Sequence, residues 1–337
     1  MNTVRKNIFF AIAAITIFLI TLSGCSSGPK INDIAQEMMD DPRLHENRSI
    51  VETKKRYTLS EDFFETNLSE PAGLTIVNGK IVVCDRAGNC LKVFSTEGKL
   101  IQDVGKTGNG ELQFIAPCQV VYSAEKYYVL DSGNSRVQIL NSDFSFSDEV
   151  ELRRIDDFDS DSGYQDLAVD HEGNIYVTTY AITPQYTKVF KVTPNGTINE
   201  IGDHLIGFIE NMNDTLFFAN YKTLYYAQEG VQEQTYVMTY ENHLYKIVDD
   251  IIEVVSELPF GFNPSDFACD GDHIYLYSER FQTLDCFDLA GNYIETLYQF
   301  DGDVSIKYIS YDETTGSLFA TSPTEGKIYR ISPQGET

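Results

Sequence analysis

The residues of this chain best suited to chemistry are carboxylates, and three of them alternate in one short run. Asp157, Asp159 and Asp161 present oxygens at every second position, the alternation that a calcium-binding loop uses. In such a loop, a glycine and a closing glutamate follow at fixed positions. Here Gly163 comes one residue late and Ala168 stands where the glutamate belongs. The run therefore fits a solvated acidic linker better than a calcium site.

Two further carboxylates, Asp166 and Asp266, lie near the starts of strand-like runs and are the remaining candidates for a divalent ion. The pattern itself predicts no cofactor, and Ca²⁺ is the ion that such oxygens would hold. The sequence has no Gly-x-Ser-x-Gly turn, no Ser/His/Asp order and no glycine-rich phosphate loop. These residue types favour a binding protein over an enzyme.

A repeated unit carries these residues. With an offset of 46 residues, Pro71 falls on Pro117 and Asp85 falls on Asp131, and each copy reads as short strands separated by turns. Repeats of 40 to 50 residues built from short strands predict propeller blades. We expect an all-β fold over residues 51–337, a six-bladed β-propeller of four-stranded antiparallel blades. The last blade lacks a fourth strand, so an N-terminal strand within 51–59 would complete it and close the ring.

Blade topology predicts that one face collects the starts of the inner strands and the turns between second and third strands. Blade four has an insertion there, residues 221–241, with five tyrosines that give either a binding loop or a loop packed on the blade edge. The residues expected on this ligand-binding face are Arg86, Gln119, Arg136, Gln165, Tyr180, Tyr225, Tyr236, Asp266, Arg280 and Lys307.

Residues 1–24 have the features of a secretory signal. Arg5 and Lys6 precede an apolar run from 8 to 22, and small residues follow. The ending Leu22-Ser23-Gly24-Cys25 resembles the lipobox of bacterial lipoproteins, which implies cleavage before Cys25, acylation of that residue with fatty acids such as palmitate, and a membrane anchor. Residues 25–50 would be the lipidated cysteine and a flexible tether. Within them, 31–39 has the spacing of a short amphipathic helix, either a spacer or a docking element.

Acidic residues dominate the charge, with 51 Asp and Glu against 25 Lys and Arg. Removal of Arg5 and Lys6 with the signal changes the net charge from −26 to −28. Because phosphate contacts need clustered cations, this balance argues against a nucleic acid partner. We expect a monomer.

Five cysteines remain beyond the signal, none in Cys-x-x-Cys spacing. They fit buried strand residues, although Cys84 and Cys90 flank one turn and remain open to pairing. The full set is Cys84, Cys90, Cys118, Cys269 and Cys286.

The run from Asp131 to Leu140 (DSGNSRVQIL) resembles the central motif of NHL repeats. The segment 98–114, followed by Pro117, resembles the outer strand and linker of that repeat. The similarity is clear in blades one and two, where Cys90 replaces the usual arginine, and weakens in later blades. The chain is also similar to the six-bladed propeller lipoproteins common in bacteria. The resemblance implies a propeller in the bacterial cell envelope.

Two functions remain open. The first is a membrane-anchored, extracytoplasmic binding or interaction module that uses one propeller face to hold a protein or glycan. The alternative is a hydrolase or lyase of the lactonase type that depends on a divalent metal in the central channel. Because one fold serves both kinds of protein, the choice depends on the site.

Overall fold

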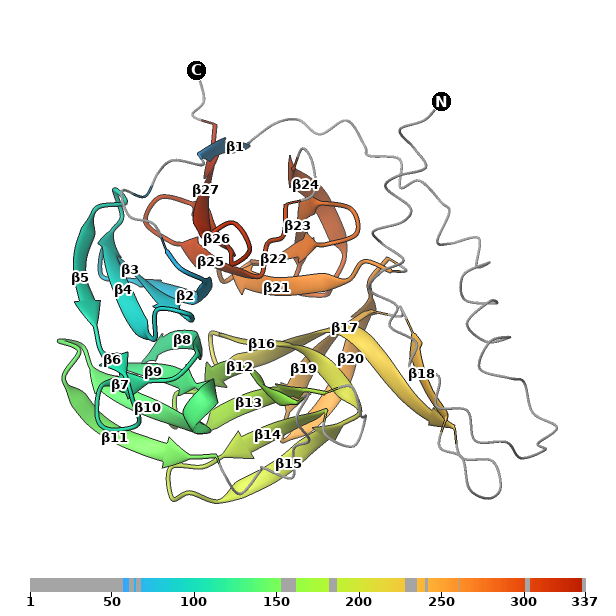
Figure 1. Ribbon diagram of the computed structural model, residues 1–337. Helices are drawn as coiled ribbons and strands as arrows, with labels where there is room; N and C mark the ends of the chain where they lie inside the picture. The colour runs from blue at the N-terminus through green and yellow to red at the C-terminus, as the bar shows by residue number, and fades with distance from the viewer. Residues whose placement is uncertain are drawn as a thin grey trace.

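The computed structural model describes residues 57–60, 64, 68–152, 162–181, 187–227, 235–239, 242–259, 261–300 and 304–334. Six antiparallel sheets of this part of the chain stand in a ring around a central axis (Figure 1). Each sheet is one blade, and its first strand in the chain, or β25 for blade six, lies innermost. The predicted six-bladed propeller of four-stranded blades is confirmed.

Blades one and two are the two copies of the repeat, and each begins at its proline. Blade one consists of β2 (Pro71–Val77), β3 (Lys80–Asp85), β4 (Cys90–Ser95) and β5 (Leu100–Val104). The linker to blade two contains a short parallel pair, β6 (Lys106–Thr107) and β7 (Gln113–Phe114). Blade two consists of β8 (Pro117–Ser123), β9 (Lys126–Asp131), β10 (Arg136–Asn141) and β11 (Phe146–Glu151), with the 3₁₀ turn η1 (Ser132–Asn134) between β9 and β10.

Blades three and four follow the same order with less regular sequence. Blade three consists of β12 (Gly163–Val169), β13 (Ile175–Tyr180), β14 (Lys188–Val192) and β15 (Ile198–Asp203). Blade four consists of β16 (Leu205–Met212), β17 (Thr215–Ala227), β19 (His243–Val248) and β20 (Ile251–Glu257), with β18 (Thr235–Thr239) paired to the far end of β17.

Blade six is completed from both ends of the described chain. Blade five consists of β21 (Pro264–Cys269), β22 (His273–Ser278), β23 (Thr283–Asp288) and β24 (Tyr293–Gln299). Blade six consists of β25 (Tyr308–Asp312), β26 (Ser317–Ser322) and β27 (Lys327–Pro333), with β1 (Tyr57–Ser60) as its outer strand. The pairing of Leu59 with Ile331 confirms that an N-terminal strand closes the ring.

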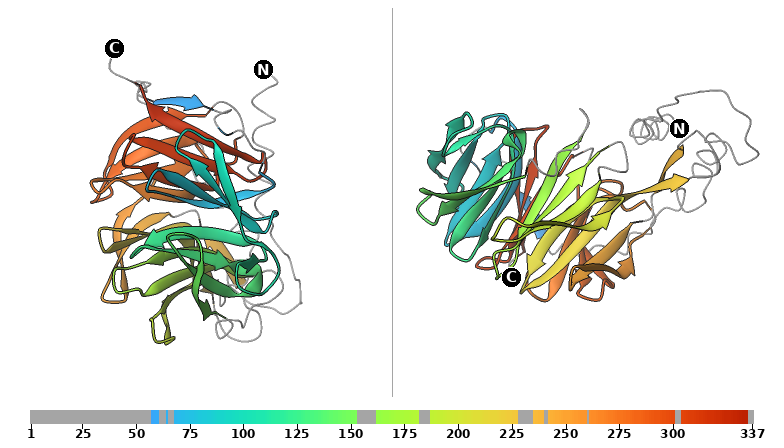
Figure 2. Two further views of the ribbon diagram at one scale, coloured as in Figure 1. Left: turned by 90° about the vertical axis from the view of Figure 1, so that its left-hand side faces the viewer. Right: turned by 90° about the horizontal axis from the view of Figure 1, so that it is seen from below.

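The insertion of blade four differs from the loop that the sequence suggested. Strand β17 runs on for 13 residues and pairs with β18 as a hairpin, in the register Tyr226 opposite Tyr236. The hairpin extends beyond the blade (Figures 1 and 2). The insertion is rich in threonine, tyrosine and valine, which favour strands, so it prolongs the sheet instead of leaving it.

The core lies between neighbouring blades, where apolar side chains from facing sheets pack together. The largest cluster includes Phe94, Phe208, Phe267 and Phe319 from four different blades, all fully buried. The five cysteines are free thiols, four of them buried and Cys269 partly so. Among the described helices, none is long and apolar enough to span a bilayer.

Candidate functional site

The inner strands place one residue of each blade at a common level of the central channel. In four blades this residue is identified by its partner on the second strand: Gln119 pairs with Leu130, Asp166 with Thr178, Phe208 with Ala219 and Tyr308 with Thr321. In blades one and five a β-bulge lies at this point, and the residue precedes Leu74 or Phe267. The ring of six residues is Gly73, Gln119, Asp166, Phe208, Asp266 and Tyr308.

The polar members of this ring connect successive blades. The Gln119 amide donates to one oxygen of Asp166 at 2.7 Å, and the other oxygen accepts from the N–H of Ile209 in blade four at 2.7 Å. In the same way, Asp266 accepts from the N–H of Ile309 in blade six at 2.9 Å. Gly73 belongs to this arrangement because a Cβ there would lie 2.7 Å from the Cα of Gln119. The ring therefore joins the blades at the axis.

A third carboxyl group, Glu210, lies two residues beyond the ring position of blade four. The other blades place Thr75, Val121, Ala168, Ala268 and Ser310 at this level. Burial raises the pKa of Glu210 to about 8, and the nearby Asp166 carboxylate adds to the rise. Among the described residues, no side chain or backbone group forms a hydrogen bond with its carboxyl. Glu210 thus holds a proton at neutral pH with its oxygens available.

The two ring carboxyls differ from Glu210 because they are tied to the backbone. Burial raises the pKa of Asp166 to about 6, against the lowering effect of the hydrogen bond from Gln119. Burial also raises the pKa of Asp266, and the charge of Asp166 adds to it. At pH 7 Asp166 is largely ionised, and its negative charge favours the protonated form of Asp266.

A small hollow opens beside Glu210, at the ends of the inner strands of blades two, three and four. Its volume is about 80 Å³, room for a few waters or for the reacting group of a larger molecule. The hollow lies at the ends of these inner strands, whereas the ligand-binding face predicted from the sequence lies at their starts. The lining residues are Val121, Tyr122, Ser123, Ala168, Val169, Glu210 and Asn211.

Two amide side chains near this axis have unused hydrogen-bonding atoms. Asn211 donates to the carbonyl of Val169 at 2.6 Å, but its buried Oδ1 has no hydrogen bond. Gln165, which is 5% exposed, has neither amide atom paired. Because an unpaired buried polar atom is costly, Asn211 Oδ1 marks a place in the hollow for a ligand or water that donates a hydrogen bond.

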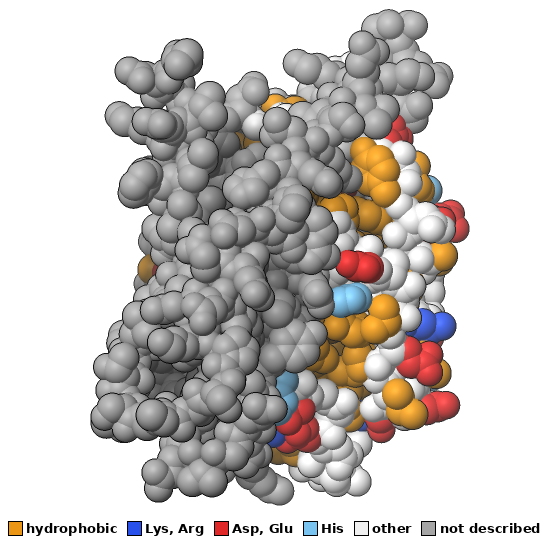
Figure 3. All heavy atoms as spheres, turned by 90° about the vertical axis from the view of Figure 1, so that its right-hand side faces the viewer, with side chains coloured by type: hydrophobic (Ala, Val, Ile, Leu, Met, Phe, Trp, Pro, Cys, Tyr) orange, Lys and Arg blue, Asp and Glu red, His pale blue; other side chains and the backbone are white. Residues whose placement is uncertain are grey.

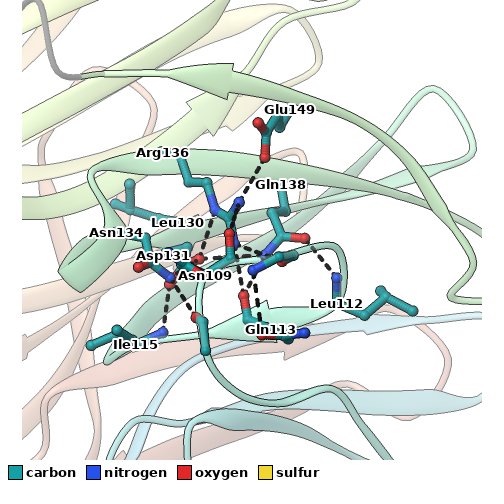
Figure 4. A network of polar contacts seen from close by, with 12 residues as sticks. Asn109, Leu112, Gln113, Ile115, Leu130, Asp131, Asn134, Arg136, Gln138 and Glu149 are labelled. Carbon is teal, nitrogen blue, oxygen red and sulfur yellow. Dashed lines mark hydrogen bonds and ion pairs between the residues drawn. The ribbon is translucent and has the colours of Figure 1, made fainter.

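Arg136 lies inside blade two and holds the linker between blades one and two (Figure 4). Its Nε donates to Asp131 at 2.9 Å, and its terminal nitrogens donate to Glu149 and to the carbonyls of Asn109, Gly110 and Gln113. All five N–H donors of the guanidinium are therefore used. The sequence placed Arg136 on the binding face, whereas the structure places it in a structural network.

The repeated aspartates Asp85 and Asp131 cap the entries to blades one and two. Asp131 accepts from the N–H of Ile115 at 2.8 Å, and Asp85 accepts from the N–H groups of Ser69 and Glu70. Position 88 requires a glycine, because a Cβ there would lie 2.7 Å from the carboxylate of Asp85.

The other predicted face residues do not form one cluster. Arg86 pairs with Glu70 at 2.7 Å on the surface, and Arg280 lies 5.1 Å from the ring of Phe281. Tyr180 is exposed beside Gly163. Lys307 lies 5.4 Å from the ring of Phe208 in the channel, and its charge acts to lower the pKa of Asp166. Tyr225 and Tyr236 are on the β17–β18 hairpin, and only their backbone is described.

A divalent ion does not fit the channel carboxyls in this arrangement. Both oxygens of Asp166 accept hydrogen bonds from the protein, and Asp266 accepts one from Ile309. In the described part of the chain, no three His, Cys, Asp or Glu side chains are grouped so as to hold a metal. The calcium-loop candidates Asp157, Asp159 and Asp161 lie outside the described residues.

The sequence reasoning missed Glu210 because blade four lacks the motif that aligns blades one and two. The available signal was a carboxylate at an inner-strand position where the other five blades have Thr, Val, Ala or Ser. An alignment of the six predicted inner strands by the second-strand residues expected to pair with them would have revealed Glu210 as the exception.

Several solved structures share this fold at low sequence identity. A streptogramin B lyase is 16% identical with a TM-score of 0.56, over 82% of this chain and 98% of that one. A gluconolactonase from Xanthomonas campestris is 13% identical with a TM-score of 0.56, over 82% and 90%. A calcium-binding protein, regucalcin, from Agrobacterium tumefaciens is 14% identical with a TM-score of 0.57, over 82% and 95%.

None of the curated proteins compared with this chain matches it. At the level of families, residues 64–322 match DUF5128, described as a 6-bladed beta-propeller. The match covers most of the chain, from the start of blade one to the end of β26 in blade six. The chain belongs to the DUF5128 family of six-bladed β-propellers.

Proposed function

We propose that this protein is a propeller hydrolase or lyase in which Glu210 transfers protons at the axis of the ring. The single observation that carries the proposal is a carboxyl group with a pKa of about 8 and no hydrogen-bond partner among the described residues, placed at a hollow. A general acid works best when its pKa lies near the working pH. The fold shared with a lyase and a gluconolactonase supports this reading over a pure binding module.

Hydrolysis of a small ester or lactone illustrates the chemistry. A water oxygen forms a bond to the carbonyl carbon, and the bond from that carbon to the leaving oxygen breaks. Glu210 gives its proton to the leaving oxygen and regains one from the attacking water, so it ends as it began. Asp166 acts as a positioning residue, because its negative charge keeps the proton on Glu210 until it is needed.

The lining of the hollow indicates the class of substrate. The channel carries carboxyl groups, which disfavour an anionic substrate near the axis. The unpaired Oδ1 of Asn211 requires a hydrogen-bond donor, such as a hydroxyl group. A neutral hydroxylated ester or lactone meets both conditions, with its reacting group in the hollow and the rest outside.

The proposal is tested by a hydrolysis and elimination screen of neutral esters and hydroxylated lactones with the full chain. We expect turnover by the wild type and a loss of at least 100-fold in Glu210→Gln. Glu111→Gln, a change on the exposed linker, is the matched control. Equal turnover by wild type and Glu210→Gln would exclude the assigned role.

A second candidate function rests on the β17–β18 hairpin, which only blade four carries among the described blades. A hairpin that projects from a rigid ring offers a contact surface for a protein or glycan. Replacement of 224–238 by a two-residue turn would abolish binding of such a partner and leave hydrolysis unchanged.

We also propose that Cys25 carries the lipid that anchors the propeller outside the cytoplasm. The support is the sequence from Leu22 to Cys25 and the apolar run before it. These residues lie outside the described part of the structure.

A further inference from the structure

The outer edges of blades four and five present an apolar surface to solvent. Ile251 and Val254 on β20 are each 61% exposed. Leu289, Tyr293 and Ile294, at the turn into β24, are 39–46% exposed. We call these five residues the blade four–five patch. Figure 3 shows hydrophobic side chains next to acidic ones on this side of the molecule. Apolar groups gathered at one place on a soluble domain indicate a contact surface.

A groove between the end of β20 and the turn before β24 adjoins this patch and shares Tyr293 with it. It is formed where the turn of blade five approaches blade four, so that a Cβ on Gly291 would lie 1.9 Å from the Ser256 hydroxyl. Its volume is about 520 Å³, and buried Phe287 and Leu258 are among the residues that line it. This is enough space for several side chains of a docked segment.

The charges around the patch are mostly negative, although Lys246 on β19 lies opposite Glu253 and Lys191 pairs with Asp250 just before β20. Glu253 and Glu257 lie on β20, Asp288 lies at the end of β23, and Glu295 lies on β24. Neither β20 nor β24 contains a lysine or an arginine. A segment that covers this surface therefore needs apolar residues together with basic ones.

The start of β1 brings the chain to this surface. β1 lies next to β24, and Glu295 is near enough to Tyr57 to contribute, after burial, to the rise of its pKa. Glu295 pairs with Cys286, and Tyr293 pairs with Phe287 one step further along the same ladder. Tyr57, at the start of β1, therefore lies near the end of β24 that carries the exposed Tyr293 and Ile294.

We propose that the blade four–five patch is the docking site of the chain's own segment 31–56, which lies outside the described residues. Immediately before Tyr57 this segment has Lys54, Lys55 and Arg56, the charges that the acidic rim requires. Its part 31–39 has isoleucine and methionine at helical spacing. Residues 40–56, at about 3.4 Å each, span up to ~58 Å, more than the width of two blades. The inference does not depend on the chemistry at Glu210.

Carbodiimide cross-linking of the full chain, with the peptides mapped by mass spectrometry, tests the contact. The reagent joins amines to carboxylates that touch. We expect Lys54 or Lys55 to be linked to Glu253, Glu257, Asp288 or Glu295 of the same chain. Links only to other acidic residues would overturn the proposal. Links between differently isotope-labelled copies would also overturn it, in favour of a second copy as the occupant.

A variant with a matched control tests the role of the apolar residues. Ile251→Asp with Val254→Asp places charges on the patch, and Ile101→Asp does so on the outer strand of blade one, where Ile101 is 51% exposed. We expect trypsin to cleave after residues 54–56 at least tenfold faster in the patch variant than in the wild type, and at the wild-type rate in the control. Equal rates in all three proteins would overturn the docking.

Discussion

The amide of Gln119 in blade two donates a 2.7 Å hydrogen bond to the carboxylate of Asp166 in blade three. The same carboxylate accepts from the backbone of blade four, so one side chain joins three blades at the channel. This contact fixes the negative charge of Asp166 where it acts on Glu210. A structural bond of the ring thus sets the protonation state of the proposed acid.

Neutralising that charge should lower the pKa of Glu210. In Asp166→Asn the Coulombic contribution is removed and burial alone keeps the pKa high. The measurement is the pH dependence of the Glu210 carboxyl band in infrared difference spectra. Asp148→Asn, an exposed change on β11, should leave the titration unchanged. An unshifted titration in Asp166→Asn would show that the two groups do not interact.

The stability of the protein should fall as the pH rises from about 5 to 9. Glu210 has a pKa near 4.5 when unfolded and about 8 when folded, so the folded state binds its proton more tightly. Its stabilising contribution is complete below pH 4.5 and is lost as the pH passes through 8. The change is on the order of a few kcal/mol in the free energy of unfolding. Urea unfolding of wild type and Glu210→Gln at several pH values measures it, and parallel curves for both proteins would contradict the assignment.

Removal of the Arg136 side chain should destabilise the propeller strongly. In Arg136→Ala the fully buried Asp131 loses its ion pair, which costs about 3–5 kcal/mol. Arg86→Ala breaks a surface pair with Glu70 and should cost about 0–1 kcal/mol. Both values follow from urea unfolding monitored by circular dichroism. A similar small loss in both variants would show that the network of Figure 4 is not what holds the linker.

The thiols of the folded protein should react slowly. Burial raises the pKa of Cys84 and raises that of Cys118 to about 12, so neither forms the reactive thiolate at neutral pH. A maleimide should label these residues only after denaturation. Rapid labelling of Cys118 in the native protein would contradict its buried position on the inner strand β8.

Substitution of Cys25 should prevent both cleavage and acylation at the proposed anchor. In Cys25→Ala neither cleavage before residue 25 nor acylation is expected. The variant should therefore keep the mass of residues 1–24 and lack the mass of the acyl chains, which mass spectrometry of the intact protein measures. A cleaved and acylated variant would refute lipidation at this residue.

The repeat was the part of the fold that the sequence expressed most clearly. Pro71, Asp85 and their counterparts recur at one offset because blades one and two have the same entry bond and the same turn. The closing strand was also predictable, since the last blade lacked its fourth strand.

The site was less predictable because it depends on contacts between blades. Topology placed Gln119, Gln165, Asp266 and Lys307 together with Arg136 on one face of the propeller, but gave no means of seeing that the linker covers Arg136. Glu210 sits in the blade whose sequence departs most from the repeat. Its unusual pKa arises from burial and from Asp166, 44 residues away in the sequence, which no local pattern reveals.

The measurement that tests the central claim most directly is the titration of the channel carboxyl itself. Infrared difference spectroscopy of the full chain follows the C=O band of a protonated carboxyl group as the pH rises. We predict a band that disappears with a midpoint near pH 8 in the wild type and is missing in Glu210→Gln. If all carboxyl groups of the wild type have already lost their protons by pH 6, Glu210 is not a proton donor at neutral pH and the proposed function is wrong.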